Sequence, residues 1–117
     1  MISQQDLPAY IESNFPELPA NKKGPSASAY DIIRQMLKYT TTQLSRHNFK
    51  AAGHCLTVVE ELYKQGNTAI KNAIENVYVF SFSHAFFYDD VKRKAIVDIL
   101  PASLYELYKR QVVNSHL

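Results

Sequence analysis

The chain has 117 residues, of which 46% are hydrophobic and 21% are charged, proportions that indicate one globular domain and exclude a disordered chain. Thirteen Lys and Arg against eleven Asp and Glu leave a net charge of +2, which is too small to indicate nucleic acid or anionic lipid as a partner. The single cysteine, Cys55, can form neither an internal disulfide nor a zinc site built from several cysteines.

Cysteine usage and the start of the chain predict the compartment. We expect a cytoplasmic protein, because a lone cysteine suits a reducing environment. The first ten residues, MISQQDLPAY, show no basic leader with an apolar stretch, and no apolar run reaches the roughly 20 residues that span a membrane. Three glycines are few for a sheet protein rich in turns, so the composition predicts long helices in a single domain, 1–117.

The first predicted helix begins near Ser3 and Asp6, whose spacing of three resembles a capping box. Pro8 is compatible with this helix only in its first turn. The apolar positions recur every four residues: Leu7, Ile11 and Phe15. Residues 16–28, PELPANKKGPSAS, contain three prolines and one glycine, so we predict a Pro-rich loop there.

Two helices with clear patterns should follow the loop. Ser28 with Asp31 predicts the start of the second helix, and Asn48 predicts the cap of the third. The apolar stripe of the second is Ile32, Ile33, Met36, Leu37, Thr40 and Leu44, and that of the third is Phe49, Ala52, Leu56, Val59, Leu62 and Tyr63. Gly66 should end the third helix and Asn67 should cap a fourth, and so short a connection predicts an antiparallel hairpin.

Residues 72–90, NAIENVYVFSFSHAFFYDD, carry conflicting patterns. Tyr78, Phe80 and Phe82 alternate with smaller residues like one face of a strand, whereas a stripe of helical period runs through the same region. That stripe is Ile70, Ala73, Ile74, Val77, Tyr78, Ser81 and Ala85. A lone strand would have no partner to pair with, so we predict that the fourth helix continues to about Ser83.

Two shorter helices complete the predicted fold. Asp89 or Asp90 should cap a fifth helix, and Pro101 should end it and fall in the first turn of a sixth. The inward positions are Val91, Ala95, Ile96 and Ile99 in the fifth and Leu104, Leu107, Tyr108 and Val112 in the sixth. The expected fold class is all-α, a compact bundle of about five or six antiparallel helices with the third and fourth as a central helix hairpin.

Six of the 14 aromatic residues fall between Tyr78 and Tyr88. Core packing is the first interpretation of this cluster, because a helix that carries rings on several sides has to be enclosed if they are to leave water. The alternative is an exposed binding patch, since exposed aromatic clusters mark contact sites. On that interpretation the partner-binding residues are Phe86, Phe87, Tyr88, Asp89 and Asp90.

His54, Cys55 and His84 form the only grouping that hints at a nucleophile or a metal site. A nucleophilic cysteine needs a base within hydrogen-bond reach and a lowered pKa, whereas a cysteine in an apolar helix is usually a small buried hydrophobe. No Glu has a His three residues later, and the motifs G-x-S-x-G, G-x-x-x-x-G-K-[ST] and H-E-x-x-H are absent. We therefore expect no catalytic residue, no cofactor and no metal.

Two stretches resemble a domain-of-unknown-function family of small bacterial all-helical proteins: residues 49–83, FKAAGHCLTVVEELYKQGNTAIKNAIENVYVFSFS, and 99–111, ILPASLYELYKRQ. The shared features are an aromatic residue that opens a helix, a cysteine and a glutamate in its middle, a glycine turn, and a late Leu-Pro pair. The resemblance covers roughly residues 28–113 and implies a fold but no catalytic residue. A looser likeness to tetratricopeptide-type helix pairs lies in Phe49, Ala52 and Gly53, although no second copy follows roughly 34 residues later.

The predicted function is a non-enzymatic protein-protein interaction module of unknown partner, because short antiparallel helices with spare aromatics offer a groove. One alternative is an immunity-type inhibitor of a bacterial toxin. Another is a small enzyme of unfamiliar design that uses His54, Cys55 and His84. The basic clusters, such as 92–94, lie near acids and are interpreted as solvated helix faces, so we do not expect nucleic acid or a membrane as a partner. A homodimer is compatible with an exposed aromatic patch.

Overall fold

The computed structural model describes residues 1–18, 28–85 and 90–115. Its elements in chain order are η1 (Gln4–Asp6), α1 (Leu7–Asn14), α2 (Ala29–Ser45), α3 (Phe49–Gln65), α4 (Thr68–Ala73), η3 (Ile74–Val79), α5 (Phe80–Ala85), α6 (Asp90–Ile99) and α7 (Ala102–Ser115). The predicted all-α class is confirmed. No helix in the described part of the chain is both long and apolar enough to cross a membrane.

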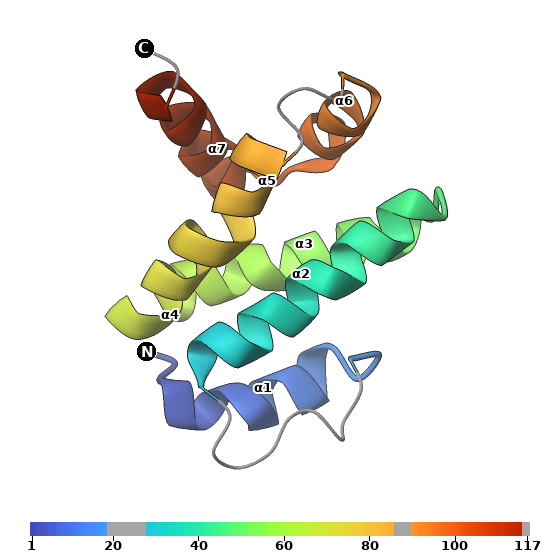
Figure 1. Cartoon of the computed structure of the whole chain (residues 1–117). Helices are drawn as coiled ribbons and strands as arrows, with labels where there is room; N and C mark the ends of the chain where they lie inside the picture. The colour runs from blue at the N-terminus through green and yellow to red at the C-terminus, as the bar shows by residue number, and fades with distance from the viewer. Residues whose placement is uncertain (19–27, 86–89, 116–117) are drawn as a thin grey trace.

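The helices pack around a central pair formed by α2 and α3. These two lie side by side across the middle of the molecule, and α1 lies beneath α2 (Figure 1). The run α4–η3–α5 reverses direction after α3 and packs against α2 as well, while α6 and α7 lie in the upper part of the view. Most of the predicted loop 16–28 lies outside the described residues, which leave out 19–27.

The helix starts follow from local capping chemistry. Ser28 Oγ accepts from the amide of Asp31 at 3.1 Å, and the carboxylate of Asp31 accepts from the amide of Ser28 at 3.4 Å. Asn48 and Asn67 cap α3 and α4 by accepting from amides three residues later, each at 3.2 Å. The predicted starts of these three helices are confirmed, as is the place of Pro8 in the first turn of α1.

The ambiguous aromatic stretch is helical, but η3 is a π-helix. Its wider turn replaces a four-residue step by a five-residue step, so Ala73 is followed on the buried face by Tyr78, and Ile74 by Val79. Beyond η3 the buried positions are therefore Phe82 and Ser83. The α-helical stripe predicted Ser81 at this point, and that prediction is wrong because the π turn shifts the helix face by one residue.

A glutamine from α7 holds the π segment in place. Gln111 Nε2 donates to the carbonyl oxygen of Glu75 inside η3 at 2.8 Å. Ser83 Oγ lies 2.9 Å from Gln111 Oε1, so the same amide also contacts α5. Because a π turn changes the partners of the helix carbonyls, a side-chain donor from a neighbouring helix stabilises the altered geometry.

Glu60 anchors α7 to α3. Its two carboxylate oxygens accept from the amides of Ser103 and Leu104, each at 3.1 Å, while the residue itself is 5% exposed. These amides belong to the first turn of α7, where no carbonyl of the helix is available to them. A buried carboxylate from one helix thus caps the N-terminus of another.

Two residues assigned to the core by their spacing are at the surface. Phe49 is 43% exposed and Val91 is 78% exposed. Each belongs to the first turn of its helix, where the apolar stripe extends past the neighbouring helices. Other residues that the spacing assigned to the core are buried, among them Leu56 and Ile96.

Candidate functional site

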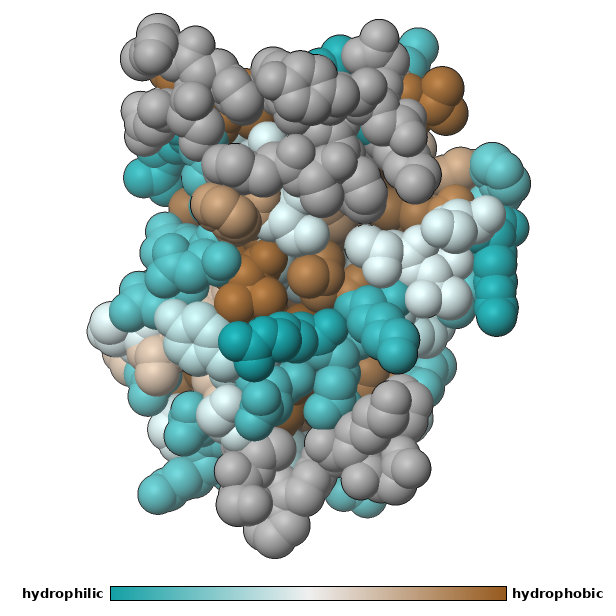
Figure 2. All heavy atoms as spheres, in the orientation of Figure 1, coloured by the Kyte–Doolittle hydropathy of each residue, from teal (hydrophilic) through white to brown (hydrophobic). Residues whose placement is uncertain are grey.

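A groove lies between the start of α3 and the length of α6. It is a hollow of about 540 Å³ lined by Phe49, Val91, Lys94, Ala95, Asp98 and Ile99. Phe49 comes from α3, and the other five residues come from α6. Four of the six lining residues are apolar. Two of these, Phe49 and Val91, are exposed although their spacing predicted burial. In the space-filling view, apolar side chains gather across the middle of the molecule above polar ones (Figure 2).

The turn between α2 and α3 places Phe49 at this groove. His47 has a φ of 58°, the left-handed conformation that ends α2, and it is the one non-glycine residue with positive φ among the described residues. This conformation carries a steric cost for a residue with a Cβ. The His47 ring stands edge-on to the Phe49 ring, with the centroids 6.0 Å apart. The strained turn therefore supports the aromatic ring that forms one wall of the groove.

Helix α6 supplies the opposite wall because it is amphipathic. Ile96 is fully buried and fixes the inner face of the helix. Val91, Ala95 and Ile99, each four residues apart, form the apolar strip that lines the groove, and Lys94 and Asp98 lie beside that strip. Ala95 in the middle has the smallest side chain of the three, which leaves the strip hollow at its centre.

The predicted partner-binding residues mostly fall outside the described chain. Phe86, Phe87, Tyr88 and Asp89 are not among the described residues, and of Asp90 the structure describes only the backbone at the start of α6. The groove begins at the next residue, Val91. Within the aromatic cluster, Tyr78 and Phe82 are buried, in agreement with core packing, while Phe80 is 47% exposed.

Sequence reasoning placed the groove residues Phe49 and Val91 in the core, because both fit apolar stripes. A usable signal was present at each position. Asn48 caps α3, so Phe49 is the first helical residue and has no preceding turn to cover it. Val91 is followed by three cations at 92–94, and charged residues are rarely buried, so this start of the helix could have been assigned to the surface.

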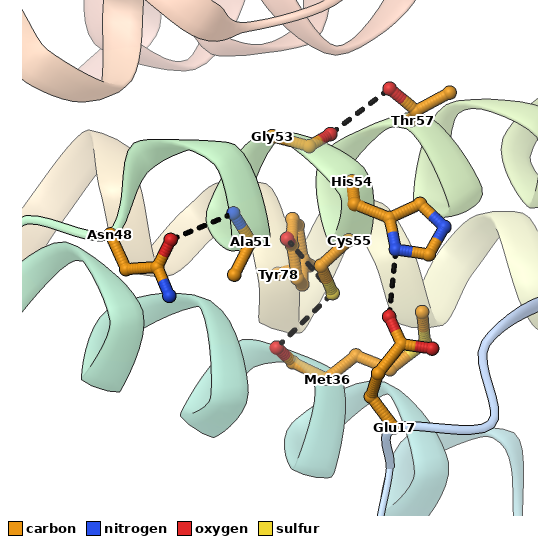
Figure 3. Close-up of polar contacts among 9 residues, drawn as sticks. All are labelled: Glu17, Met36, Asn48, Ala51, Gly53, His54, Cys55, Thr57 and Tyr78. Atoms are coloured by element: carbon orange, nitrogen blue, oxygen red, sulfur yellow. Dashed lines mark hydrogen bonds and ion pairs between the residues drawn. The ribbon is translucent and has the colours of Figure 1, made fainter.

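Cys55 is part of a buried polar cluster that joins α2, α3 and η3 (Figure 3). Its Sγ donates to the carbonyl oxygen of Met36 at 3.6 Å, and Thr40 Oγ1 donates to the same oxygen at 2.9 Å. The Tyr78 hydroxyl lies 2.6 Å from Thr40 Oγ1 and 3.9 Å from Cys55 Sγ, to which it donates. Burial raises the pKa of the Cys55 thiol from its ordinary 9.0 to about 11. A thiol in this state is protonated at neutral pH and does not act as a nucleophile.

His54 points away from Cys55, toward the outside of α3 (Figure 3). Its Nδ1 lies 2.8 Å from Glu17 Oε2, and its ring packs edge-on against Phe15 with centroids 5.2 Å apart. The pair thus fastens the segment after α1 onto α3. The backbone of His84 lies in α5, and its side chain is not described. The geometry gives Cys55 no base from His54.

The described part of the chain contains no group of three or more His, Cys, Asp or Glu side chains placed to hold a metal ion. Glu60 is the one buried carboxylate in the ranges that the structure describes, and both of its oxygens cap α7. The buried polar groups described above bond to other parts of the chain and hold helices together. The groove at α6, in contrast, exposes its apolar side chains to solvent.

Comparison with known proteins yields one match. A family model described as Domain of unknown function (DUF7674) matches residues 8–114. No curated protein and no solved structure matches the chain. The expected resemblance to an uncharacterised domain family is confirmed, and the match extends it to most of the chain.

Proposed function

The chain belongs to the DUF7674 family, and we propose that this member is a protein-binding module whose groove between α3 and α6 receives an apolar segment of a partner protein. The observation that carries the proposal is the pair of exposed apolar residues, Phe49 and Val91, on the lining of one groove. Exposed apolar side chains that gather at a concave surface mark interaction sites, whereas scattered ones do not.

A bound partner would remove the exposed side chains of Phe49 and Val91 from water. Burying a Phe or Val side chain fully contributes about 1.5 to 3 kcal/mol, and both residues retain a large exposed fraction in the free chain. The strained conformation of His47 beside Phe49 agrees with a functional role, since strained residues cluster at binding sites. A reducing cytoplasmic setting is part of the proposal, because Cys55 is a free buried thiol.

The test compares groove variants with a matched surface variant. We expect Phe49→Ser and Val91→Ser to weaken capture of a protein partner from the producing cells about tenfold each, as for truncated interface anchors. The control is Val113→Ser, which changes an apolar residue that is 54% exposed on α7 and does not line the groove. Circular dichroism would verify that all three variants fold. Partners that bind all variants equally, or a wild-type chain that captures none, would contradict the proposal.

A further inference from the structure

The N-terminal segment, residues 1–18, lies along one side of the central helix pair (Figure 1). Ile2 pairs with the end of α3, where its amide donates to the carbonyl oxygen of Gln65 at 2.7 Å. Phe15 packs nearer the middle of α3, with its ring edge-on to the His54 ring and the centroids 5.2 Å apart. The N-terminal segment therefore runs antiparallel to α3.

The same segment also contacts α2. Gln4 Oε1 accepts from the amide of Ala29 at 2.9 Å, at the start of α2. Farther along α2, the Tyr39 ring stands edge-on to the Phe15 ring, with the centroids 5.0 Å apart. Helices α2 and α3 thus form one binding surface for the N-terminal segment, and we call it the α2–α3 surface.

The N-terminal segment has the pattern of a helix bound to an apolar groove. Its apolar residues follow one another at spacings of four, four and three, and each is at most 1% exposed: Leu7, Ile11, Phe15 and Leu18. Glu12, on the other face of α1, is exposed. Because residues three and four apart share one face of a helix, a single apolar face supplies the contact with the α2–α3 surface.

The polar contacts of this segment are weak beside its apolar face. Glu17 and His54 lie 2.8 Å apart, but their side chains are 38% and 48% exposed, and exposed pairs of this kind contribute little. Helix α1 has eight residues, too few for a helix to be stable by itself in water. The N-terminal segment therefore depends on the α2–α3 surface for its folded form.

The other helices are joined by contacts that do not involve residues 1–18. The Tyr78 hydroxyl joins η3 to α2 through Thr40, and the Glu60 carboxylate joins α3 to α7. These contacts remain when the N-terminal segment leaves its place. The segment can thus open as a local unit, at a lower free energy than unfolding of the whole chain, and opening uncovers the α2–α3 surface.

We infer that the N-terminal segment of one copy can bind the α2–α3 surface of a second copy, so that two chains exchange these segments. The occupant of the surface is known, because the chain's own segment lies on it. A second copy carries an identical segment and can form every contact again, which makes exchange a low-cost route to a dimer. Within one chain, the short connection through 19–27 gives an effective concentration on the order of millimolar, so exchange needs protein concentrations near that range.

A labelled peptide of residues 1–18 tests whether the α2–α3 surface accepts a segment from another molecule. The peptide is titrated by fluorescence anisotropy against the full chain and against full-length Ile11→Ser, whose own segment competes less. We expect the peptide to bind Ile11→Ser at least about tenfold more tightly than wild type, because truncation of a fully buried residue weakens the competing segment by that factor or more. A peptide that itself carries Ile11→Ser should bind neither chain.

Two further full-length variants complete this test. Glu12→Ala changes the exposed face of α1, so this control should bind the peptide as weakly as wild type does. Ile2→Pro weakens the segment at its other end, because proline lacks the amide that bonds to Gln65, and it leaves the fully buried side chains in place. It should bind the peptide more tightly than wild type, even if Ile11→Ser fails to fold. No binding to either weakened chain, or affinities equal to that of wild type, would overturn the inference.

A pair of charge variants tests exchange between two full chains. Glu17→Arg alone places two basic side chains together at the contact with His54, and His54→Glu alone places two carboxylates there. In an exchanged dimer of these two variants, each segment lies on the other variant's surface, so both contacts again join opposite charges. We expect an equal mixture near millimolar concentration to contain about threefold more dimer in light scattering than either variant alone.

A mixture with no more dimer than the separate variants would overturn the exchange. Adding Val91→Ser to both variants shows where the dimer forms, because Val91 lines the separate groove between α3 and α6. An exchanged dimer should keep its population in this background. A dimer that Val91→Ser dissociates would lie at that groove instead and would also overturn the exchange.

Discussion

At the residue scale, Tyr78 joins η3 to α2 across the core. Its ring stands edge-on to Phe82 with centroids 5.0 Å apart, and its hydroxyl reaches Thr40 across the core. Burial raises the pKa of Tyr78 well above its ordinary 10.0, because the phenolate would lose its hydration there. The same burial keeps Cys55 protonated, so the two acidic groups at the centre of the molecule are neutral across the physiological range.

These shifts predict a loss of stability at high pH. The unfolded Cys55 thiol loses its proton near 9.0 and the folded thiol near 11, so its stabilising effect is complete below pH 9 and disappears as the pH rises to 11. A shift of this size corresponds to roughly 2 to 3 kcal/mol of unfolding free energy. Urea unfolding at a series of pH values from 8 to 11 would measure it.

The control for this prediction is Cys55→Ala, which should show a shallower decline over the same pH range because the titrating thiol is gone. In the wild type, a thiol reagent such as DTNB should react at pH 8 only after urea unfolds the chain. Rapid reaction with the native protein would show that Cys55 is neither buried nor raised in pKa.

At the element scale, Gly53 within α3 and Gly66 at the end of α3 should respond in opposite ways to substitution by alanine. A Cβ at Gly53 would meet nothing within 4 Å, so Gly53→Ala should stabilise the helix by about 0.5 to 1 kcal/mol through reduced backbone entropy of the unfolded chain. A Cβ at Gly66 would lie 2.6 Å from the carbonyl oxygen of Leu62 and 2.6 Å from Ile70 Cγ2. Gly66→Ala should therefore destabilise the fold by about 1 to 3 kcal/mol.

Thermal unfolding of the two alanine variants beside wild type checks the pair, since each serves as the other's control. We expect the midpoint to rise for Gly53→Ala and to fall for Gly66→Ala. A fall in both would mean that α3 needs the flexibility of Gly53, against the open space seen beside it.

The elements differ in how far the sequence could predict them. Caps at Ser28, Asn48 and Asn67 were predictable because the interaction spans only three residues. The π turn of η3 was not, because no local pattern marks it and its Glu75 carbonyl is bonded by Gln111, which lies 36 residues away in the sequence. Exposure of Phe49 was missed for a similar reason: apolar spacing reports a helix face, and only tertiary packing decides how much of that face is covered.

At the scale of the whole molecule, Glu60 joins the lower helices to the upper ones. We expect Glu60→Ala to lower the unfolding free energy by about 2 kcal/mol, because two amides of α7 would lose a charged acceptor in a buried place. Glu61→Ala is the matched control, since the neighbouring carboxylate pairs with Lys64 and Gln65 on the exposed side of α3. Urea unfolding would measure both variants, and equal losses would show that the cap contributes nothing.

The fold class and most helix limits of the whole chain could be predicted from the sequence, whereas the candidate site could not. The side chains of the predicted partner-binding residues, Phe86 to Asp90, lie outside the described part of the chain, so that prediction stands beside the groove lining, which begins at Val91. The groove itself arises where α6 meets the first turn of α3, a junction of residues more than 40 positions apart. Such a junction has no local signature.

The isolated bridge between Ile2 and Gly66 fixes where the chain can be extended. The amide of Ile2 donates to the carbonyl oxygen of Gln65 at 2.7 Å, and its own carbonyl accepts from Asn67 at 2.8 Å. This clasp holds the amino terminus at one end of α3, while the groove opens at the other end, about 24 Å away along the helix axis. A fluorophore or surface tether attached ahead of Ile2 would therefore leave the mouth of the groove unobstructed.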